Sequence, residues 1–515
     1  MKILLTTLNS RYSHSNLAIR SLYAAGVMNC PDLHVREYTI NNDEDYIYMD
    51  LLRGDFDVIF FSTYIWNVEK IKYLCRNLKK AKPSIRLIAG GPEVSFECGK
   101  FLEENSAFDA VIYGEGEYTF SLICRALTKG SPLFSNIRGM AYRKGEEIIV
   151  NKPMPPLKFD SLPFPYSVLP ADEDKILYYE SSRGCPYKCS YCISSIEKTV
   201  RALPLERVKR ELSYFIYKGV KQVKFVDRTF NWDRDRAYEI MKYIAMMDNG
   251  RTNFHFELSG ELIDDRLIGL VDESRKDLFQ FEIGIQSTNP LTLKAVNRKS
   301  DLKKSLLNVQ ALADTGKANV HIDLIVGLPF EGYDSIRMSF NNIYPTGADM
   351  IQVGFLKLLK GTAIRFNEKF YDYVYRDQAP YEVISNGFIS SIEVTQLKQL
   401  ENVLDLFYNK GGFENVLQYL IKETGMTPFD FYIELSNYFY LKDYHHRSYS
   451  KEDLYRIMYG YINWKARHVD IDADEAISYL ISDYEERFNE DAVKKFMKKG
   501  WEIPEVRTWQ ENIRI

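Results

Sequence analysis

Three of the seven cysteines lie within one short segment, SSRGCPYKCSYCISS, at Cys185, Cys189 and Cys192. Their spacing is C-x3-C-x2-C, and they follow directly on an apolar run, ILYYESS, of strand length. Three thiolates can each hold one corner of an iron–sulfur cube and leave the fourth iron open to bind another molecule. A structural zinc site normally takes four ligands, and no histidine or fourth cysteine stands nearby in the sequence. The segment therefore favours a cluster over zinc.

The cysteine segment follows the first of six apolar runs that alternate with helix-sized segments. Each run has the length of a buried strand, and the intervening segments, such as LERVKRELSYFIYKG, have helical spacing. Repeated strand–helix units build a parallel barrel or part of one, with its chemistry at the carboxyl ends of the strands. The six predicted strands are ILYYESS, VKQVKFVD, FHFELSG, LFQFEIGIQS, VHIDLIVGLP and MIQVGFLKLL.

The first 130 residues alternate in the same way and predict a separate, doubly wound (Rossmann-like) parallel sheet. Its ligands would bind at the carboxyl ends of the strands. The predicted strands are MKILLTTL, FDVIFFSTYI, IRLIAGGPEV and FDAVIYGEGE; the predicted helices are residues 16–26, VEKIKYLCRNLKKA and YTFSLICRALTKG.

The whole chain is expected to be an α/β protein with four parts. These are an N-terminal sheet domain at 1–130, a proline-rich connector at 131–172, a partial (β/α)6 barrel at 173–385 and an all-α region at 386–515. The connector includes a small predicted hairpin around Lys144–Gly145 and the extended stretch NKPMPPLKFDSLPFPY. After residue 386 only helical spacing appears, as in EDLYRIMYGYINWKA.

Composition limits the classes of function. A chain of 515 residues is too long for one core, and 45% hydrophobic with 27% charged residues fits a globular protein. A net charge of −4 predicts no general attraction to nucleic acid or anionic membranes. No apolar stretch approaches a membrane span, and the N-terminus does not resemble a secretory signal. We therefore expect a cytoplasmic protein, in which clustered cysteines bind metal or do redox work.

From residue 173 to about 365 the sequence resembles the radical S-adenosylmethionine (SAM) superfamily. The resemblance implies a [4Fe-4S] cluster on Cys185, Cys189 and Cys192. Its open iron would bind the amino and carboxylate groups of SAM. Reductive cleavage of SAM would then yield a 5′-deoxyadenosyl radical that takes a hydrogen atom from a substrate, with the cofactors carrying the difficult chemistry.

The resemblance also implies SAM contacts at later strand ends. Asp227 stands where the family binds the amino group, although the usual glycine–glycine–glutamate is absent. Glu257 and Gln286 correspond to ribose contacts, and Arg298 to a contact with the methionine carboxylate. Asp323 belongs to the strand that resembles the adenosine-binding one. Carboxylates accept ribose hydroxyls well, and arginine pairs bidentately with a carboxylate. The alternative is that such acids are ordinary paired or solvated strand-end residues.

The N-terminal domain resembles the cobalamin-binding domain that precedes the radical domain in one large subclass. Its glycines would let the backbone approach a flat corrin, because no side chain projects there. Cobalamin is therefore an expected third cofactor. The alternative is a cobalamin-type fold that no longer binds it. The predicted contacts are Ser62, Thr63, Gly90, Gly91, Gly114, Glu115 and Gly116.

No histidine is predicted to bind cobalt. The Asp-x-His-x-x-Gly motif of many cobalamin domains is absent, and His14 stands in an unrelated context, SRYSHSN. We therefore expect His14 to be an ordinary loop residue and His34 to lie at the surface. The resemblance implies that water or a non-histidine group faces the lower side of cobalt.

The resulting expectation is a cobalamin-dependent radical SAM enzyme, as a methyltransferase acting on an unactivated carbon of a small molecule or peptide. A reductant such as flavodoxin or ferredoxin would supply electrons. The alternatives are a cyclase or rearrangement enzyme of the same class, a tRNA-modifying radical SAM enzyme, and a non-catalytic cluster protein. The acidic composition of the C-terminal helical region argues against a groove that binds nucleic acid.

Overall fold

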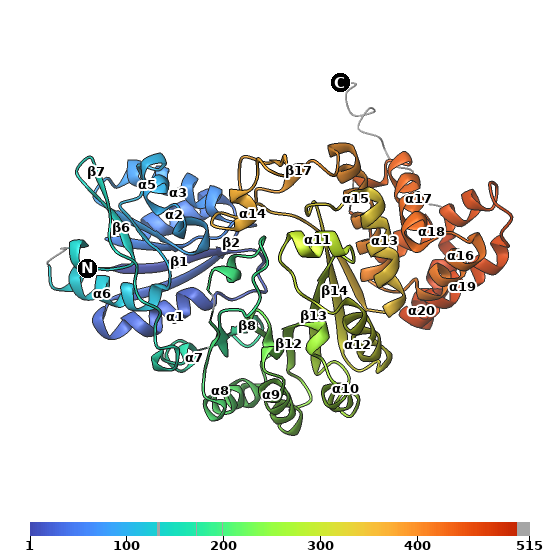
Figure 1. The fold of residues 1–515 in the computed structure, drawn as a ribbon, viewed down its shortest axis with the longest axis horizontal. Coiled ribbons are helices and arrows are strands. Elements are labelled where there is room, and N and C mark those ends of the chain that lie inside the picture. Colours follow the sequence, from blue (N-terminus) through green and yellow to red (C-terminus); the bar gives the residue numbers. More distant parts are fainter. Residues whose placement is uncertain (131–133, 171, 198, 447, 502–515) are drawn as a thin grey trace.

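The computed structural model describes residues 1–130, 134–170, 172–197, 199–446 and 448–501. The chain runs from an N-terminal sheet domain through a central sheet backed by helices to a group of helices at the other end (Figure 1). Within these ranges, no helix is both long and apolar enough to span a bilayer. Residues 131–133 and 171 of the predicted connector, and 447 and 502–515 of the predicted helical region, lie outside the described part.

The N-terminal domain contains a seven-stranded sheet in the order β2-β1-β3-β4-β5-β6-β7. The first five of these strands in the chain are parallel, as predicted, and the hairpin at Lys144–Gly145 adds β6 and β7 antiparallel to the edge beside β5. The sheet is therefore mixed. The strands are β1 (Ile3–Asn9), β2 (Leu33–Thr39), β3 (Val58–Ser62), β4 (Arg86–Gly90), β5 (Ala110–Ile112), β6 (Met140–Lys144) and β7 (Glu147–Val150).

Helices cover both faces of this sheet, and each face has its own apolar core. The helix over Val68–Ala81 shows why: Ile71, Leu74, Cys75 and Leu78 recur at helical spacing and are fully buried. The helices of this domain are α1 (Leu17–Gly26), α2 (Glu44–Arg53), α3 (Val68–Ala81), α4 (Pro92–Ser95), α5 (Cys98–Glu104) and α6 (Gly116–Thr128). Strand β2 and helix α2 were not among the predicted elements.

The central sheet consists of the six predicted strands, all parallel, in the order β15-β14-β13-β12-β11-β8. The radical SAM resemblance implied this partial barrel, and the structure confirms it. The strands are β8 (Ile176–Tyr179), β11 (Gln222–Phe225), β12 (Asn253–Leu258), β13 (Phe279–Gln286), β14 (Asn319–Val326) and β15 (Met350–Phe355).

The two faces of the central sheet differ in polarity. One face is apolar, with residues such as Phe254, Phe281 and Ile322 packed under the helices. The other face carries polar side chains at the alternate positions, including Lys224 and Glu282. The helices that accompany this sheet are α7 (Pro165–Val168), α8 (Leu205–Lys218), α9 (Arg234–Met246), α10 (Asp265–Asp272), α11 (Pro290–Ala295), α12 (Leu302–Asp314), α13 (Tyr333–Ile343) and α14 (Ala363–Phe366).

The C-terminal helices close the far edge of the central sheet. Asn409, at the end of a π-helical turn (Asp405–Asn409), accepts a hydrogen bond from the Ile351 backbone at 2.9 Å and donates one back at 3.1 Å. This side chain therefore takes the place of a further strand beside β15. After a short hairpin of β16 (Val374–Tyr375) and β17 (Val383–Ser385), the helices are α15 (Ser391–Leu404), α16 (Glu414–Thr424), α17 (Pro428–Leu441), α18 (Lys451–Lys465), α19 (Ala473–Arg487) and α20 (Glu490–Lys499).

The other edge of the central sheet is joined to the N-terminal domain. The loop after β1 runs beside β8: Ile176 N–H donates to Ser13 O at 2.7 Å, and Ser15 N–H donates to Ile176 O at 3.2 Å. His14 lies between them and hydrogen-bonds through Nδ1 to the Tyr178 hydroxyl. His14 is a loop residue, as expected, and its ring also packs on Tyr178 of the barrel.

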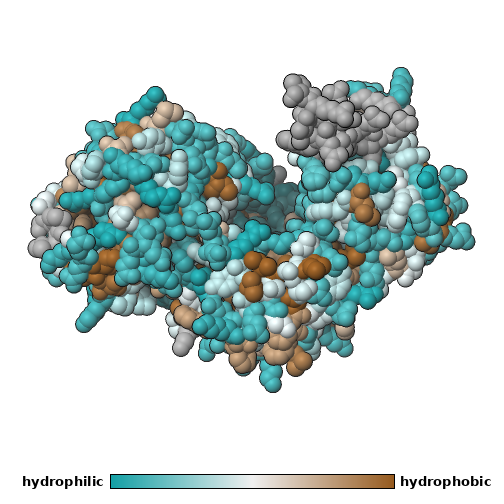
Figure 2. All heavy atoms as spheres, turned by 90° about the horizontal axis from the view of Figure 1, so that it is seen from above, coloured by the Kyte–Doolittle hydropathy of each residue, from teal (hydrophilic) through white to brown (hydrophobic). Residues whose placement is uncertain are grey.

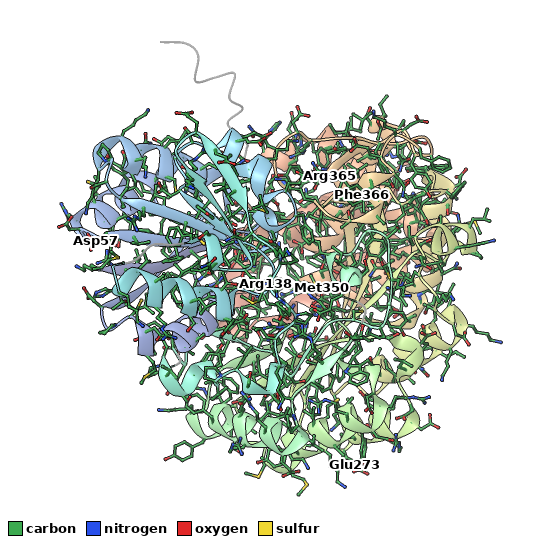
Figure 3. All side chains as sticks on the ribbon, turned by 60° about the vertical axis from the view of Figure 1, so that its left-hand side comes forward. Asp57, Arg138, Glu273, Met350, Arg365 and Phe366 are labelled. Carbon is green, nitrogen blue, oxygen red and sulfur yellow. The ribbon has the colours of Figure 1, made fainter. Side chains whose placement is uncertain are left out.

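The carboxyl ends of the N-terminal strands face the central sheet. Figure 3 shows Asp57, which precedes β3, at the outer side of its domain. At the other end of β3, burial raises the pKa of the Tyr64 hydroxyl while Arg228 of the barrel opposes the shift. Figure 2 shows a largely hydrophilic surface that is hollowed between the N-terminal domain and the C-terminal helices.

We predict that Asn409→Ala weakens the closure of β15. Loss of two hydrogen bonds at a partly buried edge would reduce local stability by about 1–3 kcal/mol. Hydrogen exchange measured by mass spectrometry should show faster exchange over Met350–Phe355. Asn402→Ala, which removes a single 3.5 Å contact, is the matched control and should leave that exchange unchanged.

Candidate cofactor site at the domain boundary

The cysteine loop is closed at its base by a two-residue antiparallel ladder of β9 (Ser182–Arg183) and β10 (Arg201–Ala202). Gly184 follows β9 with a φ of +101°, and a Cβ there would lie 2.3 Å from Thr199 O. Only glycine fits this conformation and this approach. The ladder and the glycine together bring the two ends of the loop into contact. We call these residues, 182–184 and 199–202, the neck of the loop.

The three cysteine side chains lie inside the loop. Cys185 and Cys189 are buried, and Cys192 is partly buried. The Cys185 Sγ contacts Thr229 Oγ1 at 3.5 Å, and Arg298 Nη1 donates to Cys189 Sγ at 3.7 Å. Burial raises the pKa of the Cys185 thiol. A bound cation is therefore needed to stabilise the thiolate form.

The separation of the sulfurs disfavours a single zinc ion. Zinc–sulfur bonds of ~2.3 Å in a tetrahedron bring sulfurs to about 3.8 Å from one another. The three cysteine sulfurs do not all lie within 4.8 Å of one another. The cysteine sulfurs are therefore more widely spread, as thiolates that bind different irons of one cluster must be. The loop fits a [4Fe-4S] cluster.

Asp227 follows β11 by two residues and lies directly behind the neck. Its buried carboxylate accepts hydrogen bonds from Ser181 N–H at 2.9 Å and from the hydroxyls of Ser181 and Ser182, both at 2.6 Å. Three donors thus already occupy the carboxylate predicted to bind the amino group of SAM. In this structure Asp227 fixes the entry to the cysteine loop.

Three other predicted SAM contacts share a distinctive feature. Gln286 Oε1, Arg298 Nε and Asp323 Oδ1 are buried, and none has a hydrogen-bond partner among the described residues. Gln286 also has a φ of +73°, which is rare for a residue other than glycine. Buried polar atoms are normally paired, and leaving one unpaired costs about 1–3 kcal/mol. These orphaned atoms fit a polar ligand such as SAM.

The one remaining predicted contact, Glu257, belongs to the carboxyl end of the central sheet beside the cysteine loop, which we call the mouth of the sheet. Glu257, near the end of β12, is 4.0 Å from Arg228, and burial raises the pKa of its carboxyl. Arg298 spans the mouth, because its guanidinium reaches Cys189, Tyr191 and the backbone oxygen of Gly284. The structure thus places Glu257, Gln286 and Asp323 on the successive strands β12, β13 and β14, and Arg298 in the loop after α11 beside the cysteine loop.

A charged layer beneath this mouth was missed by sequence reasoning. Glu282 pairs with Lys224 at 2.9 Å and with His255 at 3.2 Å. The His255 hydrogen bond, partly opposed by burial, and then Lys224 lower the pKa of Glu282 to about 2. Burial, Glu282 and Glu257 together raise the pKa of Asp323 to about 8. Polar residues at every second position of otherwise apolar strands were the available signal.

The cobalamin-type strand ends face this mouth from the other domain. Gly91 has a φ of +113°, and a Cβ there would lie 2.5 Å from Thr63 O. Thr63 donates through its N–H and its hydroxyl to Gly90 O, both at 2.7 Å. The protein's own packing therefore requires Gly91. Gly114 is different, because its φ is +75° and no atom lies within 4 Å of its Cβ position. The strand ends are bare there, which fits a flat macrocycle.

The other predicted cobalamin contacts, Gly116, Glu115 and Ser62, are packed against or paired with other residues of the protein. Gly116 begins α6, and its Cβ position lies 3.2 Å from the Leu22 side chain of α1. Glu115 forms ion pairs with Arg183 and Arg201 across the domain boundary. A second boundary contact, missed from the sequence, joins buried Glu93 to Lys360 at 3.0 Å and to the Tyr381 hydroxyl. Ser62, also predicted as a contact, is buried at the end of β3.

Comparison with known families agrees with these three parts. Residues 3–123 match the B12 binding domain, residues 179–343 match the radical SAM superfamily, and residues 369–514 match a protein family of unknown function, DUF4080. The chain therefore joins a B12-binding domain to a radical SAM domain and a DUF4080 region. The first two domains imply cobalamin, a [4Fe-4S] cluster and SAM.

Cobalamin-dependent radical SAM enzymes are among its homologues. The cobalamin-dependent radical SAM methyltransferase TokK of Streptomyces tokunonensis is 26% identical over 340 residues, 62% of this chain and 49% of that protein. An uncharacterized methyltransferase, PH0819, of Pyrococcus horikoshii is 28% identical over 271 residues, 50% of this chain and 58% of that protein. The chain spans about half the length of the curated relatives it matches.

Solved structures share the fold. The cobalamin-dependent SAM radical enzyme OxsB, with aqua-cobalamin and SAM bound, has a TM-score of 0.62 over 97% of this chain and 80% of its own, at 14% identity. The radical SAM methyltransferase TsrM of Kitasatospora setae, with cobalamin and a [4Fe-4S] cluster bound, has a TM-score of 0.59 over 74% of this chain and 76% of its own, also at 14% identity. The three-part arrangement is therefore a known fold.

We predict that Gly184→Ala prevents the loop from holding iron. A Cβ 2.3 Å from Thr199 O would force the neck open. Iron and sulfide per chain after anaerobic reconstitution should fall to a small fraction of the wild-type values. Gly269→Ala, in α10 with open space around its Cβ position, is the control and should retain the wild-type content. An equal content in both variants would contradict the assignment of the neck.

We also predict that Asp323 makes the ligand-free protein less stable as the pH rises. Its pKa is raised from an ordinary 3.8 to about 8 in the folded state, mainly by burial. Between these values the folded protein keeps a proton that the unfolded chain releases, so folding is favoured at low pH and this advantage is lost toward pH 8. The melting temperature of Asp323→Asn should fall less from pH 5 to pH 8 than that of the wild type. Asp265→Asn, at the start of α10, is the control and should follow the wild type.

Proposed function

We propose that this protein is a cobalamin-dependent radical SAM methyltransferase that acts on an unactivated carbon. The observation that carries the proposal is that two candidate binding surfaces face each other at the domain boundary. On one side lie the cysteine loop and the orphaned atoms of Gln286, Arg298 and Asp323. On the other lies Gly114, which follows β5 of the B12-binding domain and has open space around its Cβ position.

The three cofactors, when bound, would supply reductive cleavage of SAM and delivery of a methyl group. The chain's own residues have simpler tasks. Cys185, Cys189 and Cys192 would hold the cluster, and Asp227 would fix the loop that carries them. Arg298 lies between Cys189 and Gly284, so its free Nε would orient the methionine carboxylate.

The adenosine end of SAM would meet the next strand ends. Gln286 Oε1 would accept from a ribose hydroxyl, and so would Glu257. Asp323, which keeps its proton near neutral pH because burial raises its pKa to about 8, would present a neutral carboxyl to the nucleoside. The polar face below, with Lys224 paired to Glu282, keeps this mouth hydrophilic and suits a polar substrate. A reductant such as flavodoxin or ferredoxin would supply the electron.

The names of the relatives favour methyl transfer. Besides TokK, a 26% identical relative from Streptantibioticus cattleyicolor is 2-(S-pantetheinyl)-carbapenam-3-carboxylate methyltransferase. The chain covers 49% of that protein. An anaerobic magnesium-protoporphyrin IX monomethyl ester cyclase of Rubrivivax gelatinosus is 22% identical over 296 residues, and it supports ring formation as the second candidate.

We predict that anaerobic purification with cobalamin supplied gives a visible spectrum with both a corrin band and an iron–sulfur shoulder. Replacement of Cys185, Cys189 and Cys192 by alanine should remove the shoulder and leave the corrin band. Cys98→Ala, a buried cysteine outside the loop, is the control and should retain both. A cluster without corrin in cobalamin excess would contradict methyl transfer.

Products formed from SAM separate the two candidates. With reductant and a cell extract as substrate source, methyl transfer should give 5′-deoxyadenosine together with S-adenosylhomocysteine. Ring formation should give 5′-deoxyadenosine alone. Formation of neither product by protein that carries the cluster would contradict radical chemistry altogether.

A further inference from the structure

The neck of the cysteine loop contains two like charges in direct opposition. In the antiparallel ladder of β9 and β10, Arg183 is the register partner of Arg201. Like charges directly opposite in a sheet are destabilising. Both side chains are largely buried, with 16% and 19% of their surface exposed, so solvent and salt screen the repulsion little. The neck therefore needs a counter-charge between the two guanidiniums.

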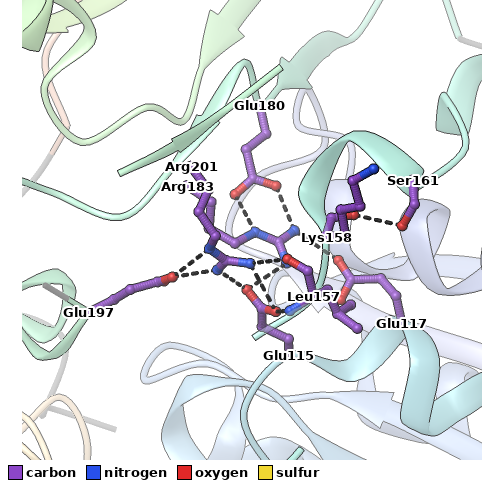
Figure 4. Close-up of polar contacts among 9 residues, drawn as sticks. All are labelled: Glu115, Glu117, Leu157, Lys158, Ser161, Glu180, Arg183, Glu197 and Arg201. Carbon is purple, nitrogen blue, oxygen red and sulfur yellow. Dashed lines mark hydrogen bonds and ion pairs between the residues drawn. The ribbon is translucent and has the colours of Figure 1, made fainter. Parts of the chain in front are cut away.

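One carboxylate from the other domain supplies it. Glu115, at the start of α6, lies with Oε1 3.2 Å from Arg183 Nη1, and it accepts hydrogen bonds from both terminal nitrogens of Arg201 (Figure 4). Among the residues of this cluster, Glu115 is the one that contacts both arginines. It thus bridges the outgoing and returning strands of the loop.

The surrounding contacts hold this bridge in place. The Leu157 backbone donates to Glu115 Oε2 at 2.7 Å and accepts from Arg201 at 2.6 Å. Burial acts to raise the pKa of the Glu115 carboxyl, but the Arg201 and Leu157 hydrogen bonds outweigh it, and the pKa lies below its ordinary value. The bridge is therefore charged at neutral pH.

The other carboxylates around the two arginines each pair with one arginine only. Glu180 binds Arg183 in a bidentate pair at 3.0 and 2.7 Å, and Glu117 binds it at 2.8 Å. Glu197 binds only Arg201. Removing one of these takes a counter-charge from a single guanidinium. Removing Glu115 would leave Arg183 with Glu180 and Glu117 and Arg201 with Glu197, but no carboxylate between the two guanidiniums.

We propose that Glu115 is a positioning residue for the cluster, through which the B12-binding domain holds the neck of the cysteine loop closed. This role differs from the corrin contact that the sequence resemblance implies for the same residue. It makes retention of the cluster depend on the neighbouring domain as well as on the loop itself. The inference rests on the proposal that Cys185, Cys189 and Cys192 hold the cluster.

The test measures how fast reconstituted full-length protein loses iron to a chelator under anaerobic conditions. Glu115→Gln, which keeps the size and removes the charge, should lose iron about tenfold faster than the wild type because the like charges then oppose each other. Glu197→Gln is the matched control from the same cluster and should stay within about twofold of the wild type. Thermal unfolding and cobalamin content of the same samples report whether the domains remain folded.

A second substitution distinguishes repulsion from simple loss of contacts. In Glu115→Gln, the added change Arg201→Gln removes one of the opposed charges and should slow iron loss again. Faster loss in the double variant than in Glu115→Gln, or wild-type retention in Glu115→Gln, would overturn the inference. Should Glu115→Gln not fold, Glu115→Asp, which is too short to bridge both arginines, replaces it in the same comparison. A wild-type protein that takes up no cluster would instead refute the proposed function.

Discussion

Buried polar atoms require partners, and at the mouth of the central sheet that requirement is not met. Gln286, Arg298 and Asp323 each leave one buried polar atom without a partner in the described structure. The surroundings do not relieve this cost. Lys224 donates to Glu282 just below, and Asp227 is saturated by serines behind the loop. These paired residues lie beside the three unpaired atoms, which fit a polar ligand.

The two domains meet through contacts of different kinds. The loop after β1 adds main-chain hydrogen bonds to β8, and Glu93 is buried against Lys360 at another point of the boundary. Glu115 reaches across to the neck of the cysteine loop. Each of these contacts comes from the segment that follows the carboxyl end of an N-terminal strand. The same strand ends that are expected to face cobalamin therefore also attach the domain to the barrel.

The regular elements were predictable because their signals are local. Apolar runs such as FEIGI and the helical spacing of Val68–Ala81 follow from burial on one or two faces. Strand β2, LHVREYT, was not predicted because apolar and polar residues alternate only weakly along it. Of its seven residues, only Leu33 and Tyr38 are large apolar or aromatic residues that are buried. The domain boundary at residue 130 remains a prediction, although the β6–β7 hairpin continues the N-terminal sheet past it.

The site was predictable where a motif marks it and not where a contact defines it. The cysteine spacing marked the loop, and serial order along the barrel pointed to Gln286, Arg298 and Asp323, whose contacts with SAM stay predictions. Nothing in the sequence pairs Glu115 with Arg183 or His14 with Tyr178, because these partners are 68 and 164 residues apart and belong to different domains. Such pairs arise only when the two sheets are placed against each other.

The loop after β1 has a consequence for motion. Ser13 and Ser15 form main-chain hydrogen bonds with Ile176. These bonds attach the N-terminal domain to the edge of the central sheet, close to the carboxyl ends of the N-terminal strands. A hinge that opened this edge would break both bonds at once. Movement of the N-terminal domain relative to the central sheet is therefore restricted near β8. Opening of the boundary elsewhere would also break the ion pairs of Glu93 with Lys360 and of Glu115 with Arg183.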